Sequence, residues 1–210
     1  MYSKRAGLVL GFHGCDESVA EEVLSGKTRL KKSSNSYDWL GHGIYFWENN
    51  PRRALQYAES IKRYPNRCRS IIKNPSVLGA VIDPGHCLNL LDSKNLELVK
   101  LSYGILETAS RKTGFQLPKN TNIENNKDLL LRPLDCIVIE NTHNIQRKRV
   151  EENDAHYEFD TVRAVFVEGK KLYQNSGFCD KNHIQMCVRN PNSIKGYFRV
   201  LDPDRNYRIP

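Results

Sequence analysis

Short apolar runs alternate with polar segments along the chain, and their spacing predicts where strands and helices lie. Compact runs of β-branched or aromatic residues indicate strands, whereas apolar residues that recur every three to four positions indicate helices. In the first half, the predicted elements are a strand over 6–14, a helix over 17–25, a strand over 44–47, a helix from Pro51, and a strand over 77–82 that 87–91 resumes. The predicted N-caps are Asp16 or Ser18 for the first helix and Asn49 or Asn50 for the second.

The second half begins with helical spacing and ends with strand-like runs. Its predicted elements are helices over 93–113 (stopped by Gly114) and 129–144, polar loops over 120–127 and 148–156, and strands over 162–167, 183–188 and 196–201. Strand-rich ends around a helical middle favour an α+β fold with a mostly antiparallel sheet. We expect a single domain over 1–210 with a helical insertion at about 92–150.

Composition limits the class of protein. With 39% hydrophobic and 27% charged residues, the chain is expected to be soluble and globular rather than disordered. It contains no apolar run of about 18 residues, so we expect no membrane span and no membrane partner. The apolar run that follows the N-terminus is too short for a secretory signal, and we expect a cytoplasmic protein.

The net charge indicates the class of partner, and the spacing of the cysteines indicates the redox state of the thiols. The 32 Lys and Arg residues exceed the 24 Asp and Glu residues, and the net charge of +8 favours polyanionic partners such as nucleic acid. A solvated basic surface explains the charge equally well. The six cysteines lie far apart, which indicates reduced thiols. Cys179, His183 and Cys187 are imaginable zinc ligands, but no second ligand pair accompanies them and we expect no metal.

The stretch from Asp38 to Ala58 is the most informative part of the chain. Gly41-His42-Gly43 predicts a tight turn, the aromatic run after it a strand that carries Tyr45, and the next segment a helix that carries Tyr57. The two tyrosines are therefore predicted to lie close together, with a slot for a flat aromatic group between them. The pattern alone favours a plainer reading, an aromatic core strand beside a capped helix. The polar residues that flank the strand argue against that reading.

Three segments together resemble a known class of enzyme. They are Phe12-His13-Gly14, Gly41-His42-Gly43-Ile44-Tyr45-Phe46 and Ala54-Leu55-Gln56-Tyr57-Ala58. They resemble the NAD-binding core of ADP-ribosyltransferases of the diphtheria-toxin and poly(ADP-ribose) polymerase type, over residues 12–58 in detail. In that class a His-Gly pair lies on an early strand, a second tyrosine lies on the helix after the Gly-x-Gly-Ile-Tyr-Phe strand, and a glutamate lies on a late strand. The resemblance implies an ADP-ribosyltransferase-like fold, with a split sheet around an NAD cleft.

The resemblance also implies a role for each matching residue. His13 would hydrogen-bond a ribose hydroxyl of NAD⁺, and the backbone of Gly14 would hold the nicotinamide carboxamide. Tyr45 and Tyr57 would sandwich the nicotinamide ring. On the late strand, Gln185 takes the position of the family's glutamate. The candidate catalytic residues are thus His13, Tyr45 and Gln185.

Gln185 determines which activity we expect. A glutamine can hydrogen-bond the ribose 2′-hydroxyl, but it has no charge to stabilise an oxocarbenium-like transition state, a contribution of about 3 kcal/mol in comparable sites. Chain elongation, which in the family depends on the glutamate, is therefore not expected, whereas transfer of a single ADP-ribose is. Alternative acids or bases near these motifs in the sequence are Glu48, Glu168, Asp180 and His183.

These inferences predict a mono-ADP-ribosyltransferase with NAD⁺ as co-substrate. The positive charge favours a nucleic-acid acceptor over a protein acceptor. Stand-alone transferases of bacterial toxin and phage-defence systems look similar, which suggests a toxin with a neutralising protein partner. Two alternatives remain open. One is a catalytically silent module that binds NAD⁺ or nucleic acid, and the other is an enzyme that hydrolyses NAD⁺ because water is the acceptor.

Overall fold

The computed structural model describes residues 7–65, 71–122, 128–153 and 157–201. Within these ranges the chain forms a seven-stranded sheet, four α-helices and one short 3₁₀ helix. In chain order the elements are β1 (Val9–Asp16), α1 (Glu17–Leu24), β2 (Ile44–Glu48), α2 (Pro51–Arg63), β3 (Pro75–Ile82), β4 (Cys87–Asn89), α3 (Ser93–Thr113), α4 (Pro133–Glu152), β5 (Thr161–Phe166), β6 (His183–Val188), η2 (Pro191–Ser193) and β7 (Ile194–Arg199).

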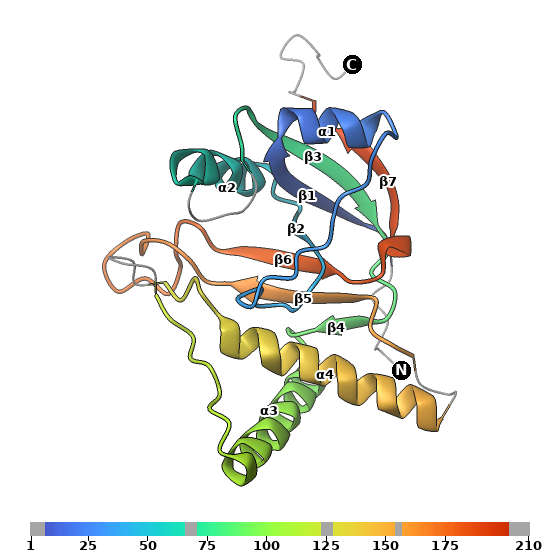
Figure 1. The fold of residues 1–210 in the computed structure, drawn as a ribbon. Helices are drawn as coiled ribbons and strands as arrows, with labels where there is room; N and C mark the ends of the chain where they lie inside the picture. The colour runs from blue at the N-terminus through green and yellow to red at the C-terminus, as the bar shows by residue number, and fades with distance from the viewer. Residues whose placement is uncertain (1–6, 66–70, 123–127, 154–156, 202–210) are drawn as a thin grey trace.

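The strands form one sheet in the order β4-β5-β6-β2-β1-β3-β7 (Figure 1). Neighbouring strands are antiparallel, except that β4 runs parallel to β5. This arrangement confirms the predicted α+β class and its mostly antiparallel sheet. It also places β6, β2 and β1 side by side, although the chain between β2 and β6 contains three other strands and three helices.

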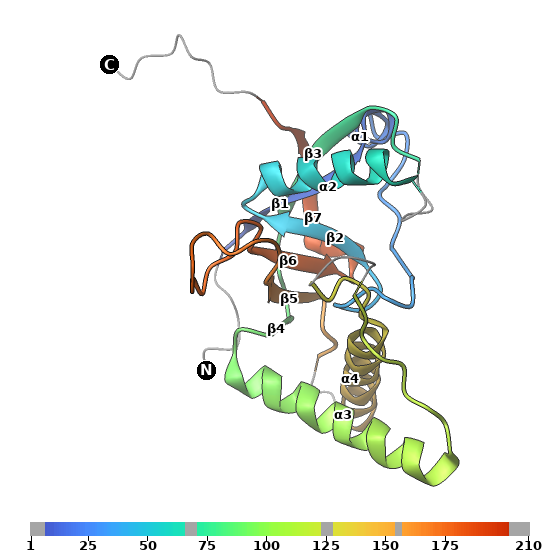
Figure 2. The same ribbon diagram turned by 90° about the vertical axis from the view of Figure 1, so that its left-hand side faces the viewer.

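The pairing of β1 with β2 is short. Only Gly11 with Glu48 and Phe12 with Trp47 are in register, whereas β1 pairs with β3 from Val9 to Asp16. Beyond Phe12 the two strands therefore continue without pairing to each other, and we call this region the β1–β2 split. The split divides the sheet into a β1-β3-β7 half, accompanied by α1 and α2, and a β4-β5-β6-β2 half, beside which α3 and α4 lie (Figures 1 and 2).

The predicted signals at the ends of the first three helices are present. The Asp16 side chain accepts a hydrogen bond from the backbone N–H of Ser18 (3.1 Å) at the start of α1. Asn50 accepts one from the N–H of Arg53 (3.0 Å) at the start of α2. α3 has the predicted bounds and ends at Gly114, whose φ of 74° is a left-handed conformation that glycine adopts without strain.

The prediction for the fourth helix is wrong at its C-terminal end. α4 spans Pro133–Glu152 rather than 129–144, so the loop predicted from Lys148 starts too early. The last turns of α4 are polar, and hydrophobic periodicity gives no signal there. Gln146 is nevertheless buried, and its side-chain amide donates to the carbonyl of Tyr157 (2.8 Å). This contact connects the end of α4 to the segment before β5.

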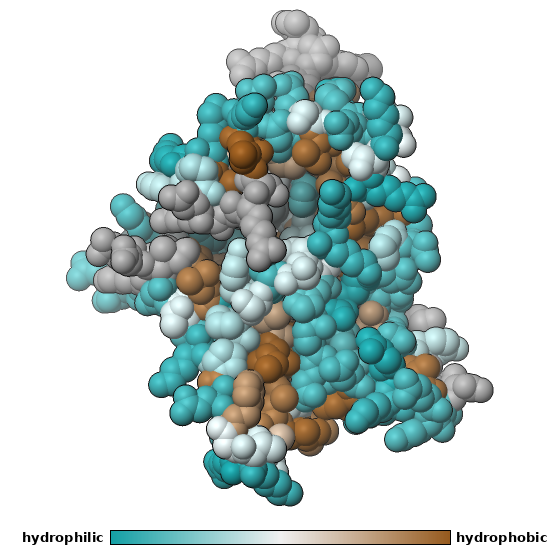
Figure 3. Space-filling view, in the orientation of Figure 1, coloured by the Kyte–Doolittle hydropathy of each residue, from teal (hydrophilic) through white to brown (hydrophobic). Residues whose placement is uncertain are grey.

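No helix in the described part of the chain is long and apolar enough to cross a membrane. The face in Figure 3 is largely hydrophilic, and hydrophobic residues gather in its lower part, in the region where Figure 1 shows α3.

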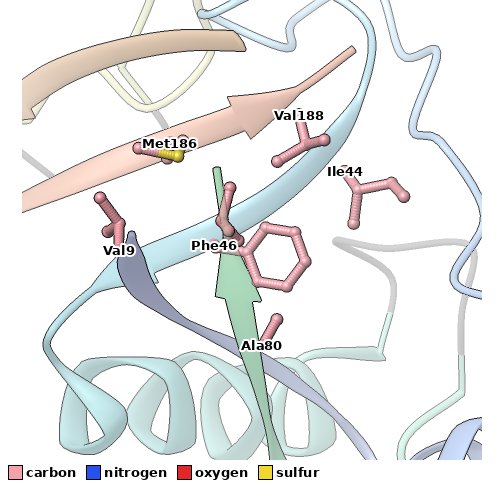
Figure 4. Close-up of a cluster of buried hydrophobic side chains, with 7 residues drawn as sticks. Val9, Ile44, Phe46, Ala80, Met186 and Val188 are labelled. Atoms are coloured by element: carbon pink, nitrogen blue, oxygen red, sulfur yellow. The ribbon is translucent and has the colours of Figure 1, made fainter. Parts of the chain in front are cut away.

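Buried side chains cover both faces of the sheet. The first cluster contains Val9, Ile44, Phe46, Ala80, Ile82, Met186 and Val188 (Figure 4). The second contains Leu40, Leu88, Ile139, Phe159, Val162, Ala164 and Cys187, with Tyr45 packed against it. Because successive side chains of a strand point to opposite faces, Ile44 and Phe46 enter the first cluster whereas Tyr45 reaches the second.

Candidate active site

The fold brings the separate sequence motifs onto neighbouring elements. β1 carries the Phe12-His13-Gly14 segment, β2 carries Tyr45, α2 carries Tyr57, and β6 carries Gln185. β6, β2 and β1 are adjacent strands, and Gln185 is in register with Trp47, two residues beyond Tyr45. Three motifs that are distant in sequence therefore lie on adjacent strands of one sheet and on the helix that follows β2.

His13 connects the two strands across the split. Its Nδ1 lies 2.8 Å from the backbone carbonyl oxygen of Tyr45. Because a carbonyl oxygen only accepts hydrogen bonds, Nδ1 carries the proton and donates it. Burial lowers the pKa of His13, against the opposing effect of that hydrogen bond. The ring is therefore neutral at neutral pH, and its Nε2 is an acceptor.

Gly14 is required by the packing of α2 against β1. A Cβ atom at this position would overlap the backbone carbonyl oxygen of Ala54 on α2. Glycine thus allows the helix that carries Tyr57 to approach the strand that carries His13. The carboxamide role implied for the Gly14 backbone stays a prediction.

The hydroxyl of Tyr45 forms two hydrogen bonds to the preceding loop. It accepts from the backbone N–H of Leu40 (3.0 Å) and donates to the carbonyl of Gly41 (2.8 Å). Burial raises the pKa of Tyr45 well above its usual value, so the hydroxyl keeps its proton. The sequence predicted ring-stacking and catalytic roles for Tyr45 but not this structural one.

The Gly41-His42-Gly43 turn is anchored by α4. Glu140 accepts a hydrogen bond from the backbone N–H of His42 (2.7 Å) and forms an ion pair with Arg189. Burial alone would raise the pKa of Glu140, but the hydrogen bonds from Arg189 and His42 lower it overall. Gly41 has a φ of 76°, and a Cβ there would overlap a Glu140 carboxylate oxygen. The helical middle of the chain therefore fixes the turn that precedes β2.

Gln185 is held by a tryptophan to which the sequence analysis gave no role. The Trp39 indole N–H donates to the Gln185 side-chain oxygen (2.6 Å). Since the indole N–H is only a donor, this contact determines the orientation of the amide and leaves its NH₂ group for other partners. The Arg132 guanidinium lies 4.9 Å from the centre of the Trp39 ring and 4.3 Å from that of Phe166.

Tyr57 packs against Trp47. The two ring centres are 5.0 Å apart with an angle of 41° between the planes, and Tyr57 is 37% exposed. Tyr57 thus lies over the part of β2 that follows Tyr45. A slot for a flat aromatic group between Tyr45 and Tyr57 stays a prediction.

Two of the alternative carboxylates are committed to ion pairs. Glu48 is buried and accepts two hydrogen bonds from Arg163 (2.5 and 3.0 Å). Glu168 forms an ion pair with Arg53 of α2 (2.7 Å), and both side chains are largely buried. Each of these carboxylates therefore has an arginine as its partner.

The other two alternative acids or bases, Asp180 and His183, form hydrogen bonds with backbone groups. A carboxylate oxygen of Asp180 accepts from the backbone N–H of Lys170 (2.8 Å). His183 is buried, and its Nδ1 lies 2.6 Å from the carbonyl of Lys181, so this nitrogen carries the proton. Burial lowers the pKa of His183, and its unprotonated Nε2 has no hydrogen-bond partner within the described residues.

The site offers no cluster for a metal ion. Among the described residues, no group of three or more His, Cys, Asp or Glu side chains is close enough to hold one. Cys15, Cys87, Cys136, Cys179 and Cys187 form no disulfide with one another.

Comparison with known proteins gives one distant relative. An uncharacterized protein of Methanocaldococcus jannaschii, MJ0359, is 28% identical over 203 residues, which cover 88% of this chain and 83% of that protein. No family model matches, and no solved structure matches. The similarity extends over most of both chains, but it assigns no activity because the relative is itself uncharacterized.

Proposed function

We propose that the chain is a mono-ADP-ribosyltransferase that binds NAD⁺ at the β1–β2 split. The observation that carries the proposal is the hydrogen bond from His13 Nδ1 to the carbonyl of Tyr45 (2.8 Å). It joins, at the split, the two segments on which the resemblance to NAD-binding transferases rests. Gln185 lies on the next strand, in register with Trp47.

Each residue has a role in this proposal. The unprotonated Nε2 of His13 accepts a hydrogen bond from a ribose hydroxyl, the backbone of Gly14 holds the carboxamide, and Tyr45 and Tyr57 flank the nicotinamide ring. The bond between the ribose C1′ and nicotinamide breaks, and its electron pair passes to the nicotinamide nitrogen. An acceptor then bonds to C1′ and loses a proton to the solvent. Binding contributes to the rate by orienting the ribose for attack.

The hydrogen bond from Trp39 supports transfer of a single unit. One lone pair of the Gln185 oxygen accepts the indole N–H, so this neutral amide offers the ribose its N–H donors and the second lone pair. It provides neither a negative charge nor a base that could activate an incoming ribose hydroxyl. Elongation to a polymer is therefore not part of the proposal.

Nucleic acid is the proposed acceptor. The net charge of +8 favours a polyanion. A cytoplasmic toxin or anti-phage effector with a neutralising protein partner belongs to the same proposal. Binding through phosphates releases counterions, so the modification of RNA or DNA should weaken sharply as salt is added. A rate that is indifferent to salt would argue for a protein acceptor instead.

The decisive experiment incubates the protein with NAD⁺ and separate RNA, DNA and protein fractions. Mass spectrometry then looks for an added ADP-ribose, and nicotinamide release is measured in parallel. We expect modification of nucleic acid that His13→Ala abolishes. His86→Ala is the matched control, since His86 stacks on Phe159 at a ring distance of 4.4 Å and has no role in the proposal. Absence of both NAD⁺ uptake in calorimetry and nicotinamide release would refute the proposal.

A second candidate is a module that binds NAD⁺ without catalysis. It is favoured by Gln185 on β6, a neutral side chain where the resembling class carries a glutamate. NAD⁺ uptake without nicotinamide release would identify this module. Free ADP-ribose as the sole product would instead identify an NAD⁺ hydrolase.

A further inference from the structure

α3 has one face that contacts nothing in the described structure. The helix packs against α4 through its other side and extends beyond it (Figures 1 and 2). Ser102 is its one buried residue among those described, and the Ser102 hydroxyl donates to the carbonyl of Val138 on α4 (3.0 Å). On the flank of the helix beside this contact, Leu101 is 52% exposed and Ile105 is 47% exposed. Two adjacent aliphatic side chains are thus left in water on a 21-residue helix.

This exposed face, the α3 stripe, has a symmetric sequence. It consists of Glu97, Lys100, Leu101, Gly104, Ile105, Thr108, Ala109 and Lys112. Its midpoint falls between Gly104 and Ile105, and residues at equal distances from the midpoint form complementary pairs. If a second copy of the helix lies antiparallel across this midpoint, Glu97 is level with the partner's Lys112, and Leu101 is level with the partner's Thr108. Gly104 is level with the partner's Ile105, and every pair occurs twice.

No contact within a single chain explains why position 104 is a glycine. A Cβ atom at this position would meet no heavy atom within 4 Å, so the packing of α3 on α4 does not require glycine. Glycine inside a helix is destabilising relative to alanine. A close approach of a second helix, with the partner's Ile105 against the bare backbone, gives Gly104 a function.

The charges at the two ends of the stripe are also unused. Glu107 and Arg111, on the same helix, form an ion pair at 3.3 Å. Within the described residues, no such pair forms for Glu97 or Lys112. Their opposite charges lie at equal distances from the midpoint, which is the arrangement that a two-fold symmetric interface requires of each copy.

We propose that the α3 stripe is an antiparallel, two-fold symmetric interface with a second copy of this chain. The Leu101 and Ile105 side chains of both copies form its centre, and two Glu97–Lys112 pairs close its ends. Because one helix per chain contributes, the interface is small, and the dimer is expected to be weak, with a dissociation constant on the order of micromolar.

Charge reversal tests the pairing. We expect sedimentation equilibrium of the full chain to show a monomer–dimer equilibrium. Glu97→Lys and Lys112→Glu should each raise the dissociation constant by about tenfold, because each places like charges together twice. The double variant should restore the dimer, and an equimolar mixture of the two single variants should form heterodimers. Glu151→Lys, an exposed position on α4 with the same charge change as Glu97→Lys, is the control and should leave the dimer unchanged.

Gly104 gives an independent test. Gly104→Leu should abolish the dimer, because its side chain occupies the place of the partner's Ile105, while the helix content of the monomer is kept or increased. Circular dichroism would verify the fold, so loss of the dimer cannot be confused with unfolding. A chain that stays monomeric at all concentrations, or a dimer that ignores Gly104→Leu and both charge reversals, would overturn the proposal.

Discussion

The hydroxyl group and the ring of Tyr45 have separate roles. The hydroxyl closes the loop before β2 through Leu40 and Gly41, whereas the ring packs against the second buried cluster and, in the proposal, flanks the nicotinamide. A substitution that removes the whole side chain would therefore disturb the loop as well as the proposed NAD⁺ site. Only a substitution that keeps the ring separates stability from binding.

Tyr45→Phe is expected to lower the free energy of unfolding by about 1–2 kcal/mol, because the backbone N–H of Leu40 and the carbonyl of Gly41 lose a partner. The ring remains, so NAD⁺ uptake should be largely kept below the unfolding transition. Urea denaturation and calorimetry measure the two effects. Tyr173→Phe is the control. Tyr173 is 62% exposed, so this variant should have the same free energy of unfolding as the unaltered protein. Equal stability losses in both variants would contradict the role of the Tyr45 hydroxyl.

The contact between Trp39 and Gln185 makes a gain of activity testable. In Gln185→Glu the carboxylate can accept the indole N–H of Trp39 and also supplies a negative charge near the proposed oxocarbenium-like ribose. We expect nicotinamide release to rise by up to about 100-fold, since a charge of this kind contributes about 3 kcal/mol. Trp39→Phe combined with Gln185→Glu should lose part of the gain, because a half-buried carboxylate without its donor ionises less readily. A slower Gln185→Glu enzyme would show that the glutamine does not occupy the proposed position.

At the scale of elements, local signals predicted what depends on local sequence. The cap of α2 and the stop of α3 were predictable because Asn50 and Gly114 act on their own helices. The strand that carries Gln185 was predicted with its bounds because a compact apolar run marks it. The existence of these elements, and hence the α+β class, therefore followed from the sequence.

The contacts that build the site were not predictable in this way. The Trp39–Gln185 hydrogen bond joins residues 146 positions apart, and the hydrogen bond from the His42 N–H to Glu140 spans 98 positions. Such contacts depend on how the elements assemble, which hydrophobic periodicity does not encode. The same holds for the parallel pairing of β4 with β5. His13 and Tyr45 were candidates from the sequence, whereas Trp39 and Glu140 had no assigned role.

The contact between α2 and β1 depends on Gly14. Gly14→Ala would place a methyl group onto the carbonyl oxygen of Ala54, so α2 must move away from β1. We expect a loss of about 1–3 kcal/mol in the free energy of unfolding and a weaker uptake of NAD⁺. Gly177→Ala is the matched control, because its Cβ would meet no heavy atom within 4 Å. A stable Gly14→Ala protein with unchanged binding would show that the close approach is unimportant.

At the scale of the whole molecule, several buried histidines make the free energy of unfolding depend on pH. Burial lowers the pKa of His143 to about 3, and it also lowers the pKa values of His13 and His183. In the unfolded chain these side chains return to the ordinary value of 6.5. Below that pH the unfolded chain therefore binds more protons than the folded protein does, and folding becomes less favourable as the pH falls.

This difference predicts a pH-dependent stability with a definite sign. As the pH falls from about 7 to about 5, the free energy of unfolding should decrease, with a slope of up to about 1.4 kcal/mol per pH unit for each histidine that stays neutral in the folded state. The depressed pKa of Glu140 affects stability only near and below its ordinary value of 4.5, so it does not account for a loss in this window. Urea denaturation at several pH values measures the slope. His143→Asn should reduce the slope by up to about 1.4 kcal/mol per pH unit, which is the contribution of one proton. A stability that is constant or rises on acidification would mean that these histidines become protonated without unfolding.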